Sequence, residues 1–457
     1  MKIRNFVLVC LFLLVPCLFA NQRGQSPEDQ ARAAKILPYL KGSPSEQECP
    51  RDILVNKPDY VVFVPKQPRR WEDRNWKRPG DTYNDHFQVI YNPSNRVLYA
   101  FWTQASREAD IDQHIAFSRS RDQGVTWSEP IVLAGSPCRD HPMLLASWQQ
   151  PMLAKSGRLY CFWNQQTTSR GPHSGMMFGS YSDNDGERWS APKLVPFTER
   201  MDADPADPAI PPSWCNWQRP LRLGENGRYF VGCSRHGKAP YDDRYGCKIE
   251  FWEFLNIDEN PAVENVKIRF LSTNRAALSA KALEAAGGFQ AREPAIEEAA
   301  PVKLPDGRLF ALMRSSVGSP VWSQSRDGGR TWSAPKILRD AEGKPFLHPR
   351  SPCPMYDWKG PEAGSGTYFA LVHQTFNFNE PNKNAYQHRG PLYLIAGQFD
   401  PHGEQPVKFK APKLFAPRRG GNSFYTSYCI VDGKGVLWYN DKKFYLCGRI
   451  IGPEWFE

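Results

Sequence analysis

The sequence predicts an all-β protein folded as a six-bladed β-propeller, and three observations support this prediction. The box SRDGGRTW at residues 325–332 follows the pattern S-x-D-x-G-x-T-W, which recurs at 120–127 and, with Asn for Asp and Arg for Thr, at 182–189. Six segments read as strand, turn and strand, with an aromatic-rich second strand. The 15 Trp, 18 Tyr and 26 Phe, with 41 Pro and 34 Gly, suit many short strands joined by tight turns. A β-sandwich explains neither the boxes nor the repeated pattern.

Each box is expected to form a turn between two strands. Its Asp can hydrogen-bond the backbone just ahead of it, its Gly supplies a positive φ, and its Trp folds back to cover the turn. The boxes therefore describe the scaffold, and the chemistry has to come from other residues.

The six strand pairs define the expected blades and the place of a binding site. A ring of blades leaves a central depression at one end, where loops from every blade converge. The loops 69–85, 201–217 and 375–389 are expected to wall this depression. The expected strand pairs are 89–104, 151–165, 220–235, 301–315, 353–374 and 429–440.

The chain is expected to divide into a signal peptide at 1–20, a short N-terminal helical arm at 21–70 and the propeller at 71–457. Lys2 and Arg4 precede an apolar run that is too short to span a bilayer, which is typical of a secretory signal. The protein is therefore expected to be secreted or periplasmic and to have no membrane span. Helices are predicted from Ser26 towards Leu40 and, in an Ala-rich segment, at 275–286. The arm can be a packing arm or a linker.

Charge and cysteine content restrict the partners. The net charge is +10, or 10 − 2 = +8 without Lys2 and Arg4, and the basic residues are scattered, which favours an anionic glycan or a solubility effect over nucleic acid. Nine cysteines (11 − 2) remain beyond the signal, and an oxidising compartment predicts some disulfides. No C-x-x-C motif or His cluster has zinc spacing, so neither a metal nor a cofactor is expected.

One predicted hairpin carries a candidate pair of charged residues. Glu298 precedes the Asp306-Gly307 turn, and Arg314 ends the returning strand. Antiparallel strands place their distant ends side by side, so the carboxylate and the guanidinium can both face the propeller axis. An ordinary surface ion pair is the alternative. With the boxes, this hairpin resembles the sialidase (neuraminidase) superfamily of retaining exo-glycosidases over about residues 81–439.

The resemblance implies a nucleophile and a site for a carboxylate. The stretch NSFYTSYCIVDG at 422–433 resembles the family segment that carries the catalytic tyrosine, which makes Tyr425 the nucleophile and Glu298 the base that removes its proton; Tyr428 is the rival by position. Arg314 and Arg389 would hold the substrate carboxylate. Arg350 competes with Arg389 for this role.

Two further positions complete the resemblance. Asp110, or alternatively Asp112, is expected to be the acid/base that protonates the leaving oxygen and then activates water. His86 stands where the family has the first arginine of its triad, so a histidine cation would have to assist in binding the carboxylate.

The resemblance implies a secreted sialidase-like exo-glycosidase that releases a terminal sialic acid from a glycan. The alternatives are a propeller glycosidase for another acidic sugar, uronic or sulfated, and a carbohydrate-binding propeller without turnover. Trp148, Trp214 and Trp217 would suit sugar stacking in each case.

Overall fold

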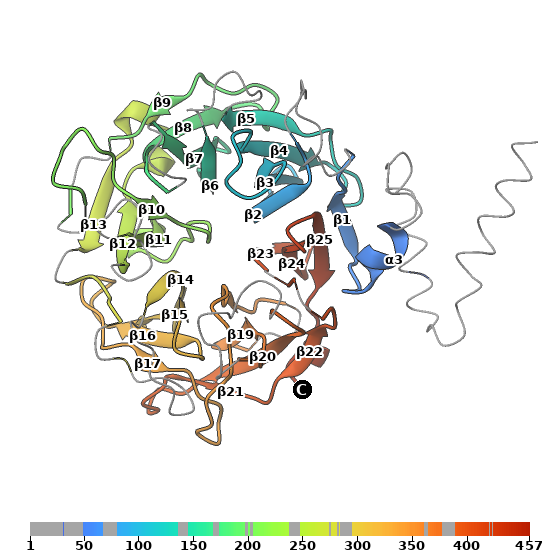
Figure 1. Ribbon diagram of the computed structural model, residues 1–457, viewed down its shortest axis with the longest axis vertical. Helices are drawn as coiled ribbons and strands as arrows, with labels where there is room; N and C mark the ends of the chain where they lie inside the picture. The colour runs from blue at the N-terminus through green and yellow to red at the C-terminus, as the bar shows by residue number, and fades with distance from the viewer. Residues whose placement is uncertain are drawn as a thin grey trace, which may run out of the picture.

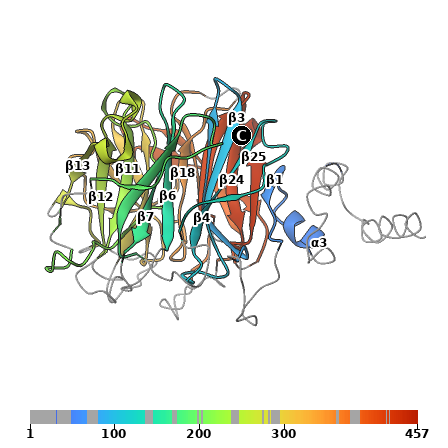
Figure 2. The ribbon, with the colours of Figure 1, turned by 90° about the horizontal axis from the view of Figure 1, so that it is seen from above.

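Six sheets stand radially around a central axis in the computed structural model, and helix is almost absent (Figure 1). The strands run roughly along the axis when the ring is seen from the side (Figure 2). The prediction of an all-β six-bladed propeller is confirmed. The structure describes residues 31, 49–66, 80–135, 145–167, 173–196, 200–201, 204–236, 247–273, 276–280, 283, 295–360, 364–376, 389–419, 421–422 and 424–457.

The first three blades follow one another along the chain, and the strands of each blade pair antiparallel from the axis outward. Blade 1 consists of β2 (Tyr83–Asn92), β3 (Val97–Ala105), β4 (His114–Ser120) and β5 (Ile131–Gly135); blade 2 of β6 (Ala146–Leu153), β7 (Leu159–Gln166), β8 (Gly175–Ser182) and β9 (Lys193–Leu194); blade 3 of β10 (Trp214–Cys215), β11 (Tyr229–Arg235), β12 (Lys248–Phe254) and β13 (Ile268–Ser272).

The last three blades repeat this arrangement. Blade 4 consists of β14 (Ile296–Lys303), β15 (Leu309–Ser315), β16 (Val321–Ser325) and β17 (Lys336–Ile337); blade 5 of β18 (Met355–Asp357), β19 (Thr367–Val372), β20 (Leu392–Phe399), β21 (Val407–Phe409) and β22 (Lys413–Ala416); blade 6 of β23 (Thr426–Val431), β24 (Lys434–Asp441), β25 (Tyr445–Ile450) and β1 (Tyr60–Phe63). Short 3-10 turns connect some strands, at Glu225–Gly227, Ile257–Glu259, Val263–Asn265 and Pro453–Trp455.

Both ends of the described chain meet in blade 6. The strand β1, which lies within the expected arm at 21–70, pairs with β25 as the outer strand of this blade. The helix α3 (Cys49–Leu54) precedes it, with Ile53 fully buried in the core shared by blades 5 and 6. Asp52 binds Arg418 at 2.6 Å and Lys442 at 2.9 Å. Residues 49–66 therefore pack against the ring, while the predicted helix towards Leu40 lies outside the described residues except for residue 31.

The six predicted strand pairs fall in six different blades, but blade 3 differs in detail. Its inner strand β10 ends at Cys215, and the predicted first strand near residue 220 contributes only a bridge between Leu221 and Phe230. The helix predicted at 275–286 is wrong where the structure describes it. Leu278 is buried there and exchanges two backbone hydrogen bonds with Ile249, because packing onto blade 3 outweighs the helical propensity of alanine.

The boxes form the expected turns. In the box at 325–332, Ser325 Oγ accepts the Gly329 N–H at 2.8 Å, and Asp327 Oδ1 accepts the Thr331 N–H at 2.9 Å. Trp332 donates to the Gly329 carbonyl at 3.1 Å and stacks at 4.0 Å on Phe251 of the preceding blade. The tryptophans of the other boxes likewise contact the preceding blade, so each box fastens two blades together.

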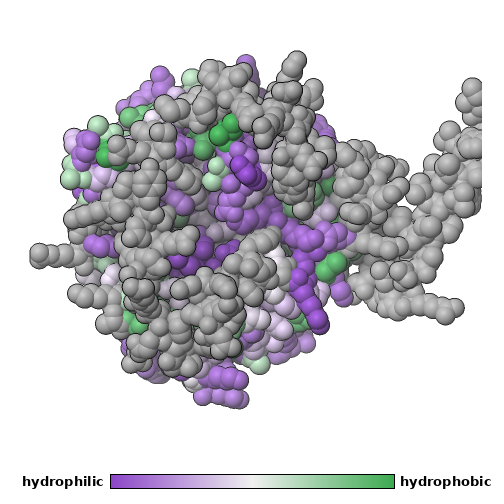
Figure 3. All heavy atoms as spheres, viewed as in Figure 1, coloured by the Kyte–Doolittle hydropathy of each residue, from purple (hydrophilic) through white to green (hydrophobic). Residues whose placement is uncertain are grey.

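The apolar core is divided among the blade junctions, whereas the axis is polar. Six buried clusters of hydrophobic residues each fill the space between two neighbouring blades. Along the inner strands, polar side chains are buried instead. Hydrophilic residues are visible near the middle of the ring in the space-filling view (Figure 3). The sheet packing therefore holds a polar site at the centre.

No helix in the described part of the chain is long and apolar enough to cross a bilayer. Of the cysteines expected to form disulfides, Cys49 and Cys138 lie outside the residues with described side chains. Free thiols are present at Cys161, Cys215, Cys233, Cys247, Cys353 and Cys429.

Candidate active site

Three inner strands carry the same irregularity at the same level of the ring. The register shifts between Asp85 and Gln88 in β2, between Ser147 and Gln150 in β6, and between Glu297 and Ala299 in β14. At each bulge one residue that is not glycine takes a left-handed φ, which costs backbone energy and re-aims its side chain. These residues are His86 (φ 52°), Trp148 (φ 53°) and Glu298 (φ 56°).

Tyr425 and Glu298 meet at the axis from blades 6 and 4. The Tyr425 hydroxyl donates a hydrogen bond of 2.8 Å to Glu298 Oε1, and Arg314 Nη1 contacts Glu298 Oε2 at 2.9 Å and the Tyr425 oxygen at 3.3 Å. Ser234 of blade 3 accepts the Glu298 N–H at 2.7 Å and so holds the bulge in place. The hairpin thus brings the predicted Glu298 and Arg314 together with the predicted Tyr425.

Burial and the Glu298 carboxylate keep Tyr425 protonated. Burial raises its pKa well above 10.0, and the Glu298 carboxylate raises it further, while Arg314 acts in the opposite direction. A neutral phenol that donates to a carboxylate is the ground state needed for proton removal during attack. The arrangement can therefore generate a nucleophile at the moment of reaction, without a free phenolate in the resting protein.

A second carboxylate, which the sequence analysis did not single out, binds two arginines. Glu297 Oε1 lies 3.0 Å from Arg314 Nε and 2.7 Å from Arg350 Nε. Burial acts to raise the pKa of Glu297, but Arg314 and Arg350 outweigh it and hold this pKa far below 4.5. Glu297 thereby positions Arg314 beside Glu298. Glu297 also pairs with Arg350, the residue that was the alternative to Arg389 for binding the substrate carboxylate.

Arg389 is a buried cation close to these groups. It is 8% exposed, and its Nη2 donates to the Arg350 carbonyl at 2.9 Å. Burial lowers its pKa, and the positive charge of Arg314 lowers it further, while Tyr425 and Glu298 act against this change. Two neighbouring guanidinium groups in a low-dielectric site favour an anionic ligand.

His86 contacts Tyr425, and its burial disfavours the charged form of its ring. Its ring lies 4.9 Å from the Tyr425 ring, and burial holds its pKa below 6.5 despite Asp85. Thr103 donates to Gln149 at 3.0 Å, so its oxygen is left to accept the His86 Nδ1–H at 3.1 Å. The other ring nitrogen, Nε2, lies 3.8 Å from Asp85 Oδ2. Burial therefore opposes the histidine cation that was expected to assist with a carboxylate, and Asp85 favours it.

A chain of charges connects the site to the loop after β3. Lys443 Nζ lies 2.9 Å from Asp85 Oδ2 and 3.0 Å from Glu108 Oε1. Asn440 accepts the Tyr425 N–H at 2.9 Å and donates to Asp85 Oδ1 at 2.6 Å. Asp85 therefore fixes both Lys443 and, through Asn440, the backbone of the tyrosine.

The loop after β3 separates the two predicted acid/base candidates. Asp112 is fully buried, and its Oδ2 accepts the N–H groups of Gly80 at 2.6 Å and Ser106 at 3.0 Å, so it holds backbone. Asp110 is partly exposed and pairs with Arg107 at 2.9 Å. Glu108 of the same loop pairs with Lys443, and its negative charge acts to raise the pKa of His86 and of Arg389.

Aromatic rings line the site on two sides. Trp217 is buried 5.7 Å from the Tyr425 ring, and Trp148 lies 5.6 Å from His86. Trp214 packs on Trp252 inside blade 3 instead. Tyr428, the rival nucleophile, packs against Tyr356 and Phe369 in the core between blades 5 and 6. Of the three expected loops, 69–85 and 375–389 lie largely outside the described residues, whereas 201–217 is described except at 202–203.

A signal for the three bulges, which were not predicted, exists in the sequence. His86, Trp148 and Glu298 each stand four positions before the equivalent core residues Ile90, Met152 and Val302. An alignment of the hairpins with one another would have matched all three bulges. Glu297, Asp85 and Lys443 have no such signal, because their roles depend on partners from other blades.

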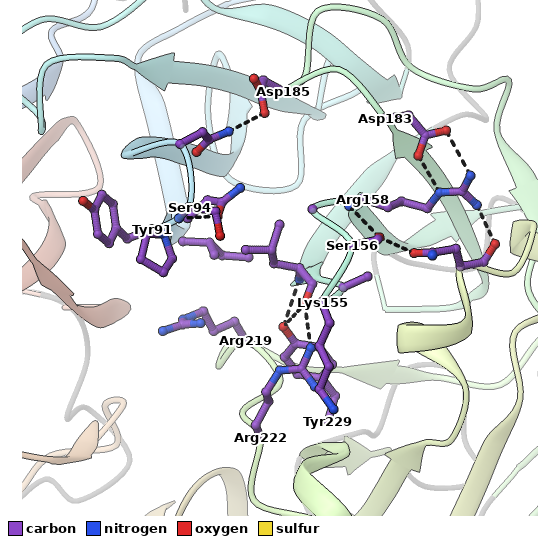
Figure 4. A pocket seen from close by; sticks show the side chains of 18 of the residues that line it. Tyr91, Ser94, Lys155, Ser156, Arg158, Asp183, Asp185, Arg219, Arg222 and Tyr229 are labelled. Carbon is purple, nitrogen blue, oxygen red and sulfur yellow. Dashed lines mark hydrogen bonds and ion pairs between the residues drawn. The ribbon is translucent and has the colours of Figure 1, made fainter.

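Two pockets lie at the opposite end of the ring. One of about 780 Å³ and one of about 1350 Å³ share Ile90, Tyr91 and Arg219 among their lining residues. Tyr91 is five residues beyond His86 on β2, roughly 17 Å along the strand. Arg158 pairs with Asp183 inside the smaller pocket (Figure 4), and Arg222, which also lines it, pairs with Asp258.

The fold is similar to that of solved glycosidase propellers. The Hadza microbial sialidase Hz136 matches with a TM-score of 0.54 and 13% identity over 82% of this chain and 66% of that one. The K499G mutant of NanB sialidase from Streptococcus pneumoniae matches with a TM-score of 0.53 and 11% identity over 86% of this chain and 69% of that one. The α-L-arabinanase of Penicillium chrysogenum matches with a TM-score of 0.50 and 14% identity over 86% of this chain and 98% of that one. The chain thus spans slightly less than two thirds of the Hadza enzyme, and these identities show the fold alone. These structures share the propeller fold of this chain, as the resemblance implied.

The family follows from a longer sequence match. Residues 96–403, more than half of the chain, match the BNR repeat-like domain. The chain belongs to this family. No curated protein sequence matches it.

Proposed function

We propose that the protein is a retaining exo-glycosidase that releases a terminal anionic sugar, sialic acid, from a glycan. The observation that carries this proposal is the Tyr425 hydroxyl on Glu298 Oε1 at 2.8 Å, with Arg314 touching both groups. A lectin needs sugar contacts but has no use for a tyrosine that donates to a buried base. This pair therefore favours turnover over binding alone.

In the proposed first step, the Tyr425 oxygen forms a bond to the anomeric carbon while Glu298 takes the phenol proton. The glycosidic bond breaks, and a loop carboxylic acid gives its proton to the departing oxygen. Water then attacks the anomeric carbon of the glycosyl-tyrosine, and the loop carboxylate accepts a proton from this water. The bond from this carbon to the Tyr425 oxygen breaks, and Glu298 returns its proton to that oxygen. A neutral nucleophile avoids repulsion by the sugar carboxylate, which Arg314 and Arg389 would hold.

The proton donor is proposed to come from the loop after β3. Asp110 is the candidate from the sequence, and Glu108 is favoured by its electrostatic effect on His86 and Arg389. Replacing the true donor should abolish cleavage of a glycoside with a poor leaving group but spare one with an activated leaving group. Comparison of Asp110→Asn with Glu108→Gln on both substrates shows which residue is the donor. If both variants keep full activity on both substrates, the donor does not come from this loop.

A second candidate substrate follows from His86. Burial lowers the pKa of His86, so the ring favours its neutral form at the position where a third cation would strengthen sialic acid binding. If Nδ1 donates to Thr103, Nε2 is an acceptor. An acceptor suits a sugar hydroxyl, which favours a uronic acid or a sulfated sugar as the alternative. The same residues would then catalyse hydrolysis of a different acidic sugar.

A panel of fluorogenic sialosides, uronides and sulfated glycosides tests the proposal. Wild-type protein should hydrolyse a sialoside, and Tyr425→Phe should lose at least about 10³-fold in kcat. Cleavage of a uronide but no sialoside would select the alternative. Unchanged activity in Tyr425→Phe, or no hydrolysis of any acidic glycoside, would contradict the proposed mechanism.

The site of action is part of the same proposal. We propose export through residues 1–20, with cleavage after Ala20. The N-terminal sequence of the exported protein should then begin at Asn21. Retention of the intact N-terminus in the cytoplasm would contradict this step.

A further inference from the structure

We propose that His173, Cys215 and His236 form a binding site for a zinc ion at the junction of blades 2 and 3. The ligand atoms of these three residues lie within 4.8 Å of one another. The Cys215 Sγ and His236 Nε2 atoms are 3.4 Å apart. Zinc bonds of about 2.3 Å to sulfur and 2.0–2.1 Å to nitrogen give a tetrahedral edge of roughly 3.6 Å, so this pair already has the right separation.

The backbone brings the three positions together before any ion binds. His173 precedes β8, Cys215 lies on β10, and His236 directly follows β11. The His173 carbonyl accepts the Trp214 N–H at 3.0 Å, and the Ser213 carbonyl accepts the His236 N–H at 2.9 Å. These bonds fix the residues on either side of the Cys215 segment, so the entropic cost of assembling the site is largely met by the fold.

The protein alone leaves this cluster incompletely satisfied. His236 is 4% exposed, and its Nδ1 has no hydrogen-bond partner among the described residues. Cys215 is equally buried, and a thiol is a weak donor to His236. Two imidazoles and one thiolate are the soft and borderline ligands that select zinc over magnesium or calcium. His173 is only partly buried, which leaves a route for an ion to enter.

The cluster adjoins the candidate active site. Trp148 stacks on His173 with ring centres 4.7 Å apart and an interplanar angle of 20°, and its ring centre lies 5.6 Å from that of His86. An ion here would join blades 2 and 3 and fix the imidazole against which Trp148 rests. With three protein ligands, a fourth position is left for water or for a group from the ligand. This inference does not depend on the proposed glycosidase activity.

Zinc uptake by the purified full chain tests the site directly. After chelation and readdition of zinc, wild-type protein should retain about one ion per chain, whereas Cys215→Ser should bind at least about 100-fold more weakly. Cys429→Ser is the matched control, since its thiol accepts Trp438 Nε1 at 3.2 Å in blade 6 and a hydroxyl can do the same. The Cys429→Ser control should bind zinc as tightly as the wild type does. Added zinc should raise the Tm of the wild type and of this control.

Cobalt supplies a readout of the ligands themselves. Wild-type protein loaded with Co²⁺ should show tetrahedral ligand-field bands and a thiolate charge-transfer band, and Cys215→Ser should lose the latter. If Cys215→Ser fails to fold, His173→Gln, at a partly exposed position, should weaken zinc binding in a folded protein. Equal zinc binding by wild type and a folded ligand variant, or no thiolate band with cobalt, would overturn the proposal and leave a thiol hydrogen-bonded to imidazole.

Discussion

The Tyr425 hydroxyl lies 2.8 Å from Glu298 Oε1, although the two residues are 127 positions apart in the chain. Each comes from a different blade, and each is held by a neighbour. Ser234 accepts the backbone N–H of Glu298, and Asn440 accepts that of Tyr425. The propeller therefore fixes both partners of a nucleophile and base from outside the pair itself.

Glu298→Gln should change Tyr425 in a measurable way. The carboxylate raises the pKa of the phenol, so its removal should lower this pKa while burial still keeps it above 10.0. Hydrolysis should fall by about 10² to 10⁴-fold, as expected for loss of a general base. NMR of ring-labelled tyrosine, with Tyr425→Phe to assign the signal, measures the pKa. An identical tyrosine pKa in both proteins would contradict the pairing.

Glu297→Gln should destabilise the protein in a pH-dependent manner. At pH 7 it removes the buried counter-charge of Arg350 and leaves Arg314 paired with Glu298 alone, which costs about 3–5 kcal/mol in the free energy of unfolding. The pKa of Glu297 is lowered on folding, so its contribution is complete above about 4.5 and is lost as the pH falls towards the folded value.

Urea denaturation at pH 7 and at lower pH measures this difference. The difference in the free energy of unfolding between wild type and Glu297→Gln should be largest near neutral pH and should become smaller below pH 4.5. Glu404→Gln is the control, because Glu404 forms an exposed ion pair with Lys336 and its loss should leave stability unchanged. A gap that widens on acidification would show that the arginines do not depend on Glu297.

Asp112→Ala and Asp110→Ala should separate structure from chemistry in the loop after β3. Asp112→Ala leaves the buried N–H groups of Gly80 and Ser106 without their acceptor and should cost about 1–3 kcal/mol. Asp110→Ala removes a partly exposed pair with Arg107 and should cost about 1 kcal/mol or less. Thermal or urea unfolding checks the order, and equal losses would mean that Asp110 also supports the fold.

Trp332→Phe should cost more stability than Trp189→Phe. Trp332 Nε1 donates to the Gly329 carbonyl at 3.1 Å, whereas Trp189 Nε1 has no partner in the described part of the chain. Both phenylalanines keep a ring against the preceding blade, so the lost hydrogen bond should appear as a difference of about 1 kcal/mol. Chemical denaturation of the two variants measures it. A larger loss in Trp189→Phe would assign the stabilisation to ring packing alone.

The scaffold could be predicted because its signals are local. A box such as 325–332 carries its own hydrogen-bond partners, so the same eight residues fold into the same turn in each blade that has them. The hairpin with Glu298 and Arg314 was likewise predictable, since a short turn determines which strand ends are neighbours. Blade 3 and the segment at Leu278 departed from prediction where packing against other strands decided the outcome.

Residue patterns along the chain were enough to predict the ring of six blades, the box turns and the candidates Glu298, Arg314 and Tyr425. The folded chain was needed to show that Glu297 pairs with Arg350, that burial lowers the pKa of His86, and that β1 completes blade 6. It also brought together His173, Cys215 and His236, whose spacing matches no metal-binding motif. The physical reason is that charge state and ligand geometry depend on burial and on partners from other blades, and neither is encoded in a local run of residues.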